Sequence, residues 1–407
     1  FGLAYAHSED DFKTIHDLLL HVRGEYASVY GSGKNNINAS LDYLIGLLKI
    51  KDTVTSQYEI ELSEETQKLC QGYANGINYY IESNDNIEQF IYPVKAEDIA
   101  AGFIYKMPFF FDLPLFISAL YSKKPEEIPE SFTINDKIEI FTKGSNVFAV
   151  SPLLTDNNST FLAINSHQPW EGDLAWYEAH IYSDEGWNMS GGLFPGSPVV
   201  LVGFNENLGW GHTVNAPDIL DIYQLEINPD NENQYLFDGK WMDLEEYDVN
   251  INIKTIGKFS INHKEAAFWS VHGPVIKGKH ATYAIRYSWD NNIKTIEQWY
   301  YMNKAKNFKE WNEAMSMMAL PMFNAGYADK EGNIFYIYNA KLPIRKNNFN
   351  WNGVIPGNTS ETLWKEFVKY EDLPQILNPP SGFIQNCNNT PYYTTKDKHN
   401  NPMPNFD

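Results

Sequence analysis

The stretch GSNVFAV, residues 144–150, marks a change in the character of the chain. Before it, residues 122–144 (SKKPEEIPESFTINDKIEIFTKG) are charged, contain two prolines and show little apolar periodicity, which is typical of an exposed connector or an excised spacer. After it, apolar and polar residues alternate as they do in strands. Gly144 has no Cβ and therefore permits the strained backbone that a peptide-bond rearrangement at Ser145 needs. By itself, however, a Gly-Ser pair more often marks an ordinary loop.

The part of the chain before this junction is predicted to be helical. Apolar residues recur at three- and four-residue spacing, and the predicted helices cover residues 12–22, 41–48, 66–81 and 97–120. Ser63 is expected to cap the third of them, because its hydroxyl can accept from free backbone N–H groups and two glutamates follow it. Pro108 and Pro114 are expected to kink or break the fourth.

The part after the junction is predicted to be rich in sheet. The predicted strands are VFAVS, FLAIN, WYEAHIYS, PVVLVGF, YDVNINIKTI, ATYAIRYSW and NIFYIYNA. We therefore divide the chain into a helical segment (1–121), a connector or spacer (122–144) and a sheet-rich segment (145–407).

Composition excludes several classes of protein. With 407 residues, 43% of them hydrophobic, the chain can bury a large core. Its 52 acidic and 31 basic residues give a net charge of −21, which disfavours nucleic acid as a partner, and no apolar stretch is long enough to predict a membrane span. Cys70 and Cys387 match no disulfide or zinc spacing. Metal-dependent hydrolysis is disfavoured, since HExxH is absent and His16 and His21 do not share a helix face well.

Ordered motifs along nearly the whole chain resemble the penicillin acylase family, which includes acyl-homoserine lactone acylases. After the junction these are GSNVFAVS (144–151), NSHQPW (165–170), LFPGSPVVLVGFNENLGWGHTVNAPDILDIYQL (193–225), MFNAGYADKEGNIFYIYNAKLPIR (322–345) and NPPSGFIQNCNNTP (378–391). Before it, FGLAYAHSEDDF and QGYANGINYYI are similar to the family's α-chain. The resemblance implies an α+β fold of the N-terminal-nucleophile hydrolase type, a four-layer αββα sandwich of two antiparallel sheets flanked by helices. It also implies a preceding strand before Phe1 and further chain beyond Asp407.

The resemblance further implies a mechanism. Autocatalytic cleavage between Gly144 and Ser145 would give an α/β heterodimer from one precursor and make Ser145 the first residue of the β-chain. Its own α-amine would then act as the base for its hydroxyl, because an α-amino group has a pKa of about 7.7–8.0 and is partly neutral near pH 7. The expected reaction is hydrolysis of a small linear N-acyl amide, with no required cofactor, in a periplasmic or secreted protein.

Catalytic positions carry over by position in the motifs. The resemblance assigns the oxyanion donors to the backbone N–H of Val214 and the side chain of Asn324, and places Arg345 near the site. His167 stands where acyl-homoserine lactone acylases have histidine and penicillin G acylase has glutamine. It therefore favours a fatty-acyl amide over a penicillin or cephalosporin as substrate. From the residues alone, Asn324 could be a turn asparagine, Arg345 a surface charge and His167 a packing residue.

An apolar acyl pocket and a calcium site are also implied. The residues similar to the pocket lining are Met107, Phe111, Phe194, Pro195 and Val202, with a polar Gln168 where an aromatic residue is expected. Each apolar member could instead be ordinary core. The carboxylates of Asp218 and Asp221 could contribute to a structural calcium site, although only with further oxygen ligands.

An alternative interpretation of the sequence, from another functional class, is a noncatalytic glycan-binding protein. The chain is acidic, sheet-rich and 15% aromatic, and Trp170, Trp176, Trp187 and Trp351 could serve as stacking platforms for sugar rings. This reading predicts one intact chain, whereas the hydrolase reading predicts two fragments, the larger beginning at Ser145.

Overall fold

The structure is a computed structural model, and it describes residues 1–110, 113–124, 128, 144–257, 259–288 and 292–397. Phe111 and most of the predicted connector 122–144 lie outside the described residues.

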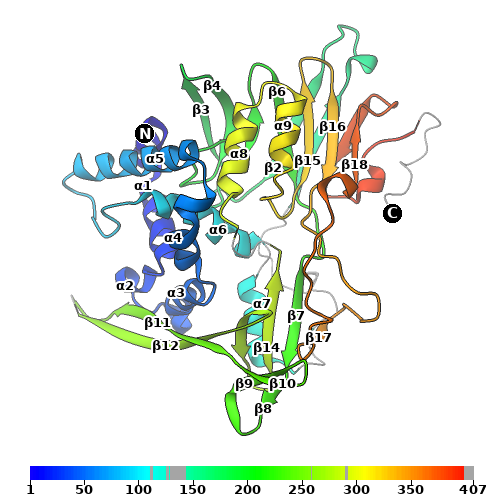
Figure 1. The fold of residues 1–407 in the computed structure, drawn as a ribbon. Helices are drawn as coiled ribbons and strands as arrows, with labels where there is room; N and C mark the ends of the chain where they lie inside the picture. Colours follow the sequence, from blue (N-terminus) through cyan, green and yellow to red (C-terminus); the bar gives the residue numbers. More distant parts are fainter. Residues whose placement is uncertain (111–112, 125–127, 129–143, 258, 289–291, 398–407) are drawn as a thin grey trace.

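The first part of the chain forms a helical layer (Figure 1, blue to cyan). Its helices are α1 (Gly2–Arg23), α2 (Tyr26–Tyr30), α3 (Ile37–Leu47), α4 (Ile50–Glu61), α5 (Glu64–Glu82), α6 (Ala96–Phe110) and α7 (Leu113–Ser122). Ser63 caps α5 as predicted, its hydroxyl accepting from the backbone N–H of Thr66 at 3.3 Å. The segment 97–120, predicted to be kinked or broken by its prolines, forms two helices. Pro108 lies inside α6, while Pro114 falls in the first turn of α7, where a missing N–H costs little.

A seven-stranded antiparallel sheet forms the centre of the second part. Its order is β18 (Gln375–Leu377), β16 (Ile334–Tyr338), β15 (Asn324–Asp329), β6 (Leu208–Thr213), β5 (Val202–Phe204), β4 (Trp187–Leu193) and β3 (Tyr177–Ser183). Of the strand predicted as PVVLVGF, only its end at β5 is confirmed. Two helices that the sequence analysis did not predict, α8 (Thr295–Lys304) and α9 (Phe308–Met315), cover one face of this sheet (Figure 1). The ring of Trp311 from α9 packs 4.8 Å from that of Tyr327 in β15.

A three-stranded antiparallel sheet packs against the opposite face. Its order is β19 (Phe383–Asn386), β1 (Gly144–Val150) and β2 (Phe161–His167). Glycines allow the close approach: a Cβ at Gly326 would lie 2.7 Å from Val147, and one at Gly211 would lie 2.9 Å from Ile164. Two antiparallel sheets thus lie face to face, with α8 and α9 outside the larger one, and the predicted α+β fold is confirmed. On its outer face the smaller sheet leaves Phe148 exposed to 43%.

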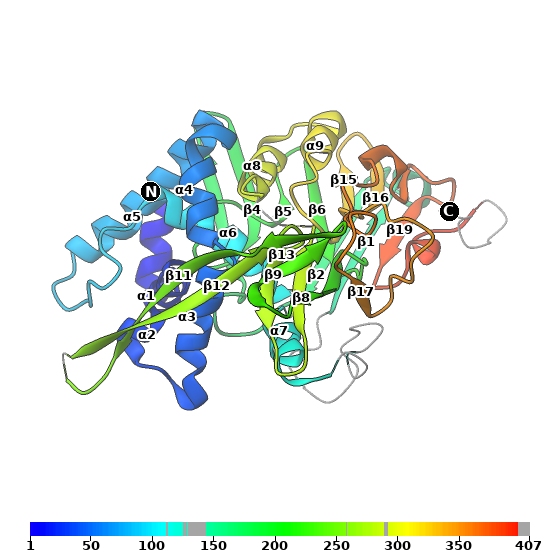
Figure 2. The same cartoon turned by 60° about the horizontal axis from the view of Figure 1, so that its bottom comes forward.

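A third sheet joins the helical layer to the rest of the chain. Its order is β11 (Glu245–Lys254), β12 (Ser260–Ser270), β13 (Gly273–Lys277), β14 (Thr282–Tyr287), β7 (Leu220–Leu225) and β17 (Val354–Pro356). A small separate sheet has the order β10 (Lys240–Asp243), β9 (Asn231–Phe237) and β8 (Ile227–Asn228). The long β11–β12 hairpin extends across α2 and α3 (Figure 2). The Tyr247 hydroxyl and the Trp269 indole N–H both donate to the backbone oxygen of Leu47, at 2.8 and 2.7 Å.

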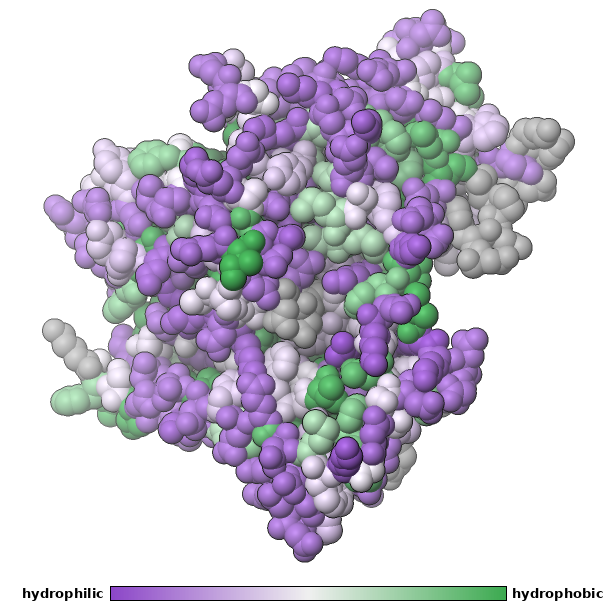
Figure 3. All heavy atoms as spheres, viewed as in Figure 1, coloured by the Kyte–Doolittle hydropathy of each residue, from purple (hydrophilic) through white to green (hydrophobic). Residues whose placement is uncertain are grey.

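The surface carries the polarity that the composition predicts. On the face shown in Figure 3, hydrophilic side chains dominate and apolar ones form small separate patches. Within the described residues, no helix combines the length and the apolar character needed to cross a bilayer. Cys70 is buried, Cys387 is exposed, and both are free thiols.

Candidate active site

Ser145 lies at the start of β1, where three segments that are distant in sequence meet. The residue is only 3% exposed. Its backbone N–H donates to Oδ1 of Asn388 at 2.7 Å, and its Oγ donates to the carbonyl oxygen of Gly144 at 2.5 Å. The hydroxyl is therefore held beside the peptide bond that precedes it.

Asn388 connects Ser145 to the end of β6. Its Oδ1 accepts from Ser145, and its Nδ2 donates to the backbone oxygen of Val214 at 2.8 Å. Its φ is +66°, in the left-handed region that asparagine tolerates better than most residues. The sequence analysis missed Asn388, although it quoted the motif that contains it, because nothing in the sequence shows that residues 145 and 388 meet.

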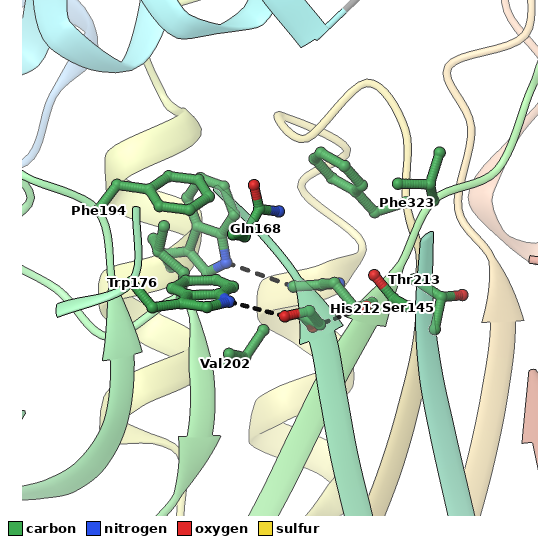
Figure 4. A pocket seen from close by; sticks show the side chains of 12 residues that line it. Ser145, Gln168, Trp176, Phe194, Val202, His212, Thr213 and Phe323 are labelled. Atoms are coloured by element: carbon green, nitrogen blue, oxygen red, sulfur yellow. Dashed lines mark hydrogen bonds between the residues drawn. The ribbon is translucent and has the colours of Figure 1, made fainter. Parts of the chain in front are cut away.

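A cavity with about 410 Å³ of empty space opens beside Ser145 (Figure 4). It is lined by Ser145, Ser166, Gln168, Trp176, Phe194, Leu201, Val202, His212, Thr213, Val214, Trp299 and Phe323. We call it the Ser145 cavity. Of the predicted positions, Gln168, Phe194, Val202 and Val214 thus lie around the same space as Ser145. The lining is mainly apolar and aromatic, as in sites that bind small molecules.

Tryptophan side chains that the sequence analysis did not assign to an acyl pocket form part of its wall. Trp176 stacks on Phe194 with ring centroids 4.6 Å apart, and its indole N–H donates to the backbone oxygen of Ser166 at 2.9 Å. Of the four tryptophans considered as sugar platforms, Trp176 alone lines this cavity. Trp187 packs against Tyr300, and Trp351 donates to the backbone of a nearby loop, so the four do not share one surface.

His212 lines the cavity but is held in its neutral form. Burial lowers its pKa to about 4. The indole N–H of Trp299 donates to its Nε2 at 3.4 Å, and its Nδ1 lies 3.3 Å from the backbone oxygen of Asn324, so Nδ1 carries the proton. Because its one lone pair faces Trp299, His212 is not placed to take a proton from Ser145.

Asn324 begins β15 beside the end of β6. Asn324 is fully buried. Its Nδ2 donates to Oγ1 of Thr213 at 3.0 Å and to Oδ1 of Asn386 at 3.2 Å. Its Oδ1 accepts from the Tyr336 hydroxyl at 2.7 Å. The predicted pair Val214 and Asn324 is thus brought together. The Asn324 amide, however, is engaged within this network and does not line the Ser145 cavity.

Phe323, the residue before Asn324, has an unusual backbone. Its φ is +88°, a conformation that costs a bulky side chain roughly 1–3 kcal/mol. A hydrogen bond from its N–H to Oδ1 of Asn215, at 2.9 Å, supports the conformation. The ring faces the Ser145 cavity (Figure 4).

Arg345 lies in an ion-pair cluster and does not line the Ser145 cavity. Its guanidinium binds Asp221 through Nε at 2.9 Å and Asp218 through two nitrogens at 3.0 Å. Burial raises the pKa of Asp221 to about 6, and the nearby Arg345 opposes this rise. Both carboxylates are thus bound to a cation already, and no cluster of three acidic, histidine or cysteine side chains occurs among the described residues. The arrangement does not fit the calcium site implied by the sequence.

His167 pairs with Gly144 across β1 and β2. Its Nε2 lies 3.3 Å from the side-chain amides of Asn146 and Asn165, and a Cβ added to Gly144 would lie only 3.0 Å from its Nδ1. His167 therefore stands directly beside the Gly144-Ser145 bond, although it does not line the cavity.

Met107 lines a small neighbouring cavity. Its other lining residues are Gly102, Phe103, Lys106, Phe194, Gly196, Ser197, Leu201 and Trp299. We call it the Lys106 cavity. It shares Phe194, Leu201 and Trp299 with the Ser145 cavity, so these three side chains stand between the two spaces. Phe111 cannot be placed, since it lies outside the described residues.

Comparisons with known proteins agree with this architecture. Acyl-homoserine lactone acylase PvdQ from Pseudomonas fluorescens (strain Pf0-1) is 25% identical over 371 residues, which are 84% of this chain and 48% of that protein. Penicillin G acylase from Escherichia coli is 30% identical over 230 residues, 54% of this chain and 26% of that protein. A solved structure, thermostable penicillin G acylase from Alcaligenes faecalis, superposes with a TM-score of 0.55 at 30% identity, covering 63% of this chain and 46% of that one.

This chain spans about half the length of the acyl-homoserine lactone acylase that it matches. The sequence profile of the penicillin amidase family, in contrast, matches residues 1–404, almost the entire chain. The face-to-face sheets, the buried Ser145 at the start of β1 and this match lead to one assignment. The chain belongs to the penicillin amidase family.

Proposed function

We propose that the protein hydrolyses a linear N-acyl amide to a carboxylic acid and an amine, with Ser145 as nucleophile. The observation that carries this proposal is the position of Ser145, whose hydroxyl lies against the carbonyl of Gly144 and whose backbone nitrogen is held by Asn388 at the edge of an apolar cavity. Family membership and the named acylases among its relatives support the same reaction.

The first step would release the nucleophile. Oγ of Ser145 attacks the carbonyl carbon of Gly144, the peptide C–N bond breaks, and the nitrogen leaves as the α-amine of Ser145 with the hydroxyl proton. Water then hydrolyses the resulting ester, which frees the carboxylate of Gly144 and the hydroxyl of Ser145. The products would be the two chains of a heterodimer, held together by contacts such as the β11–β12 hairpin on α2 and α3.

The same serine would then act on the substrate. Its neutral α-amine accepts the hydroxyl proton while Oγ attacks the amide carbon, and the leaving amine takes that proton as its C–N bond breaks. Water hydrolyses the acyl ester and restores the serine. Val214 is proposed to provide a backbone N–H to the oxyanion, and Asn324 beside it would contribute its amide after reorientation. His212, neutral and occupied by Trp299, takes no part as a base.

The lining favours an aliphatic or aromatic acyl group. Trp176, Phe194, Trp299 and Phe323 surround the space beside Ser145. A fatty-acyl amide, such as an acyl-homoserine lactone, is the preferred substrate class, because His167 follows the lactone acylase pattern. A penicillin-type acylase is the second candidate, favoured by the stacked Trp176 and Phe194, which form an aromatic wall against which an aryl ring could pack. A periplasmic or secreted location belongs to the same proposal and rests on resemblance alone.

The test compares the purified protein with its Ser145→Ala variant. Intact mass and N-terminal sequencing should show two chains, the larger beginning at Ser145, and only one chain in the variant. A panel of short-acyl, long-acyl and phenylacetyl amides, assayed for free amine, should show turnover by the normal protein alone.

Ser166→Ala is a matched control, because Ser166 lines the same cavity and contributes only a hydroxyl bonded to a backbone oxygen of His212. It should still be cleaved. A Ser145→Ala variant that is cleaved and active would overturn the proposal. Equal turnover of all three acyl classes would overturn the preference for fatty-acyl amides.

A further inference from the structure

His212 takes no part as a base in the reaction described above, yet it contacts three parts of the site. The residue lies on β6, two positions before Val214, and is only 8% exposed. Its backbone oxygen accepts from the hydroxyl of Ser166 at 3.1 Å, and Ser166 pairs with Ser145 across β1 and β2. The strand that carries His212 is therefore tied to the strand beside the nucleophile.

The imidazole of His212 joins the two other parts. Its Nδ1 lies 3.3 Å from the backbone oxygen of Asn324, whose side chain is the proposed second donor to the oxyanion. Its Nε2 accepts from the indole N–H of Trp299, in the wall of the Ser145 cavity, at 3.4 Å (Figure 4). The neutral ring has one N–H and one lone pair, and each has a partner. The ring thus bridges the cavity wall on α8 and the first residue of β15.

The backbone of Asn324 needs such a support, because its side chain has to turn before it can face an oxyanion. The Asn324 amide donates to Thr213 and Asn386 and does not line the Ser145 cavity. Reorientation exchanges these two partners, so other contacts have to hold the Asn324 backbone while the side chain moves. The hydrogen bond from His212 to the backbone oxygen is a contact of this kind, since it does not involve the Asn324 side chain.

Two aromatic side chains of the cavity wall also pack against the imidazole. The ring centroid of Phe323, the residue with a φ of +88°, lies 5.9 Å from that of His212. The ring of Trp299 meets the imidazole edge-on at 6.1 Å. An acyl group in the Ser145 cavity would contact Phe323 and Trp299, because both line that space. His212 is therefore located where acyl binding and oxyanion stabilisation meet.

We propose that His212 is a positioning residue for the hydrolysis, which holds the Asn324 backbone through Nδ1 and the Trp299 side chain through Nε2. This inference rests on the proposed hydrolase function and adds one residue to its machinery. An oxyanion donor typically contributes about 10²–10³ in rate, and a misplaced donor loses part of that contribution. Loss of the bond to Asn324 should therefore lower kcat by about 10- to 100-fold, with a much smaller change in KM.

The competing explanation is an ordinary core histidine whose two ring nitrogens are satisfied. His272 offers a comparison, because it is also buried, burial lowers its pKa to about 4, and its Nε2 lies 3.0 Å from the backbone oxygen of Gly357. His272 lines neither of the two cavities. A core role predicts that activity falls only as stability falls, whereas a positioning role predicts a loss of kcat in a protein that stays folded.

The experiment separates the two hydrogen bonds of the imidazole with two variants of the purified protein. In His212→Asn, the amide nitrogen can replace Nδ1 and donate to the Asn324 oxygen, but the side chain is too short to reach Trp299. In His212→Gln, the amide oxygen can replace Nε2 and accept from Trp299, but nothing donates to Asn324. His212→Leu removes both bonds, and His272→Gln is the matched control.

The rates are measured on acetyl and hexanoyl amides of p-nitroaniline and are normalised to the amount of mature chain, determined by intact mass. His212→Asn should keep most of its kcat on the acetyl amide and lose part of the preference for the hexanoyl amide. His212→Gln should keep that preference, while kcat on both amides falls by about 10- to 100-fold. His212→Leu should show both losses, and His272→Gln should show neither, even if its melting temperature falls.

Equal losses in the Asn and Gln variants, or losses that follow the melting temperature in every variant, would overturn the role of His212 and leave the hydrolase proposal standing. If the normal protein hydrolyses no amide, the hydrolase proposal fails instead. Where a variant gives no mature chain, nitrogen NMR of the Ser145→Ala protein with labelled histidines decides. A neutral His212 ring protonated at Nδ1 supports the bond to Asn324, and one protonated at Nε2 overturns it.

Discussion

Replacing Asn388 by glycine should uncouple the nitrogen of Ser145 from the rest of the site. The backbone at residue 388 has a φ of +66°, which glycine adopts without strain, so the variant removes the side chain and keeps the turn. Two hydrogen bonds disappear, from the Ser145 N–H at 2.7 Å and to the Val214 oxygen at 2.8 Å.

The size of the effect follows from these two bonds. Each is worth about 0.5–1.5 kcal/mol, so together they contribute about 1–3 kcal/mol, or a roughly 5- to 150-fold change in rate if they are needed for chemistry. After the proposed cleavage, the Asn388 oxygen would accept from the protonated α-amine of Ser145, so its loss should lower the pKa of that amine. The acid limb of the kcat profile should therefore shift to lower pH.

The assay follows cleavage at Gly144-Ser145 by intact mass over time, and then kcat, KM and the pH profile of the mature protein. Both the rate of cleavage and kcat should fall, with KM changed much less. Asn389→Ala is the control, because its side chain bonds the N–H of Cys387 and does not reach Ser145. A glycine variant that matures at the normal rate, with an unmoved pH profile, would refute the positioning role of Asn388.

Two further predictions test the local structure. Gly144→Ala places a Cβ 3.0 Å from Nδ1 of His167, so cleavage at Gly144-Ser145, measured by intact mass, should slow by about tenfold. Adding His167→Ala should restore much of the cleavage rate, and a double variant that stays slow would argue against the steric explanation. Burial raises the pKa of Asp42 from 3.8 to about 6, and two backbone N–H groups at the start of α2, which donate to its carboxylate, oppose this rise. Because the folded protein then binds a proton more tightly than the unfolded chain, the contribution of Asp42 to the free energy of unfolding should increase as pH falls from 6 to 4. Denaturant unfolding of the normal protein and Asp42→Asn should diverge over this range by about 2 kcal/mol, and parallel curves would contradict the shift.

The helices of the first part were largely predictable because their apolar periodicity is local. The predicted segments 12–22 and 66–81 lie within α1 and α5, and the cap at Ser63 formed as expected. The predicted break in the apolar segment 97–120 is confirmed near Pro114, where α7 begins, because proline is tolerated in the first turn of a helix; Pro108 does not end α6. Helices α8 and α9 were missed, since their short apolar faces lie among strand-like sequence.

The site was only partly predictable, because its contacts join distant segments. Motif resemblance placed Gln168, Phe194 and Val202 around Ser145, but nothing in the sequence showed that Arg345 would bind Asp218 and Asp221 instead of lining the cavity. Trp299 comes from α8, an unpredicted helix, and Asn388 follows a strand pairing that only the folded chain reveals. Pairings of this kind depend on tertiary packing and leave no local signal.

Three copies of the dipeptide Gly-Ser occur in the chain, at 31–32, 144–145 and 196–197. The glycine of the first copy caps the end of α2 and that of the last lies in a turn, with φ of +75° and +80°. The middle copy, in contrast, is paired within a sheet and is held by Asn388. If the chain is cut as proposed, the Gly-Ser dipeptide by itself does not determine where the cut occurs. The cleavage site is determined instead by the contact between Ser145 and Asn388, which are 243 positions apart in the sequence. Maturation would then act as a quality check on folding, because a chain whose later segment has not docked would keep its serine locked in an intact peptide bond.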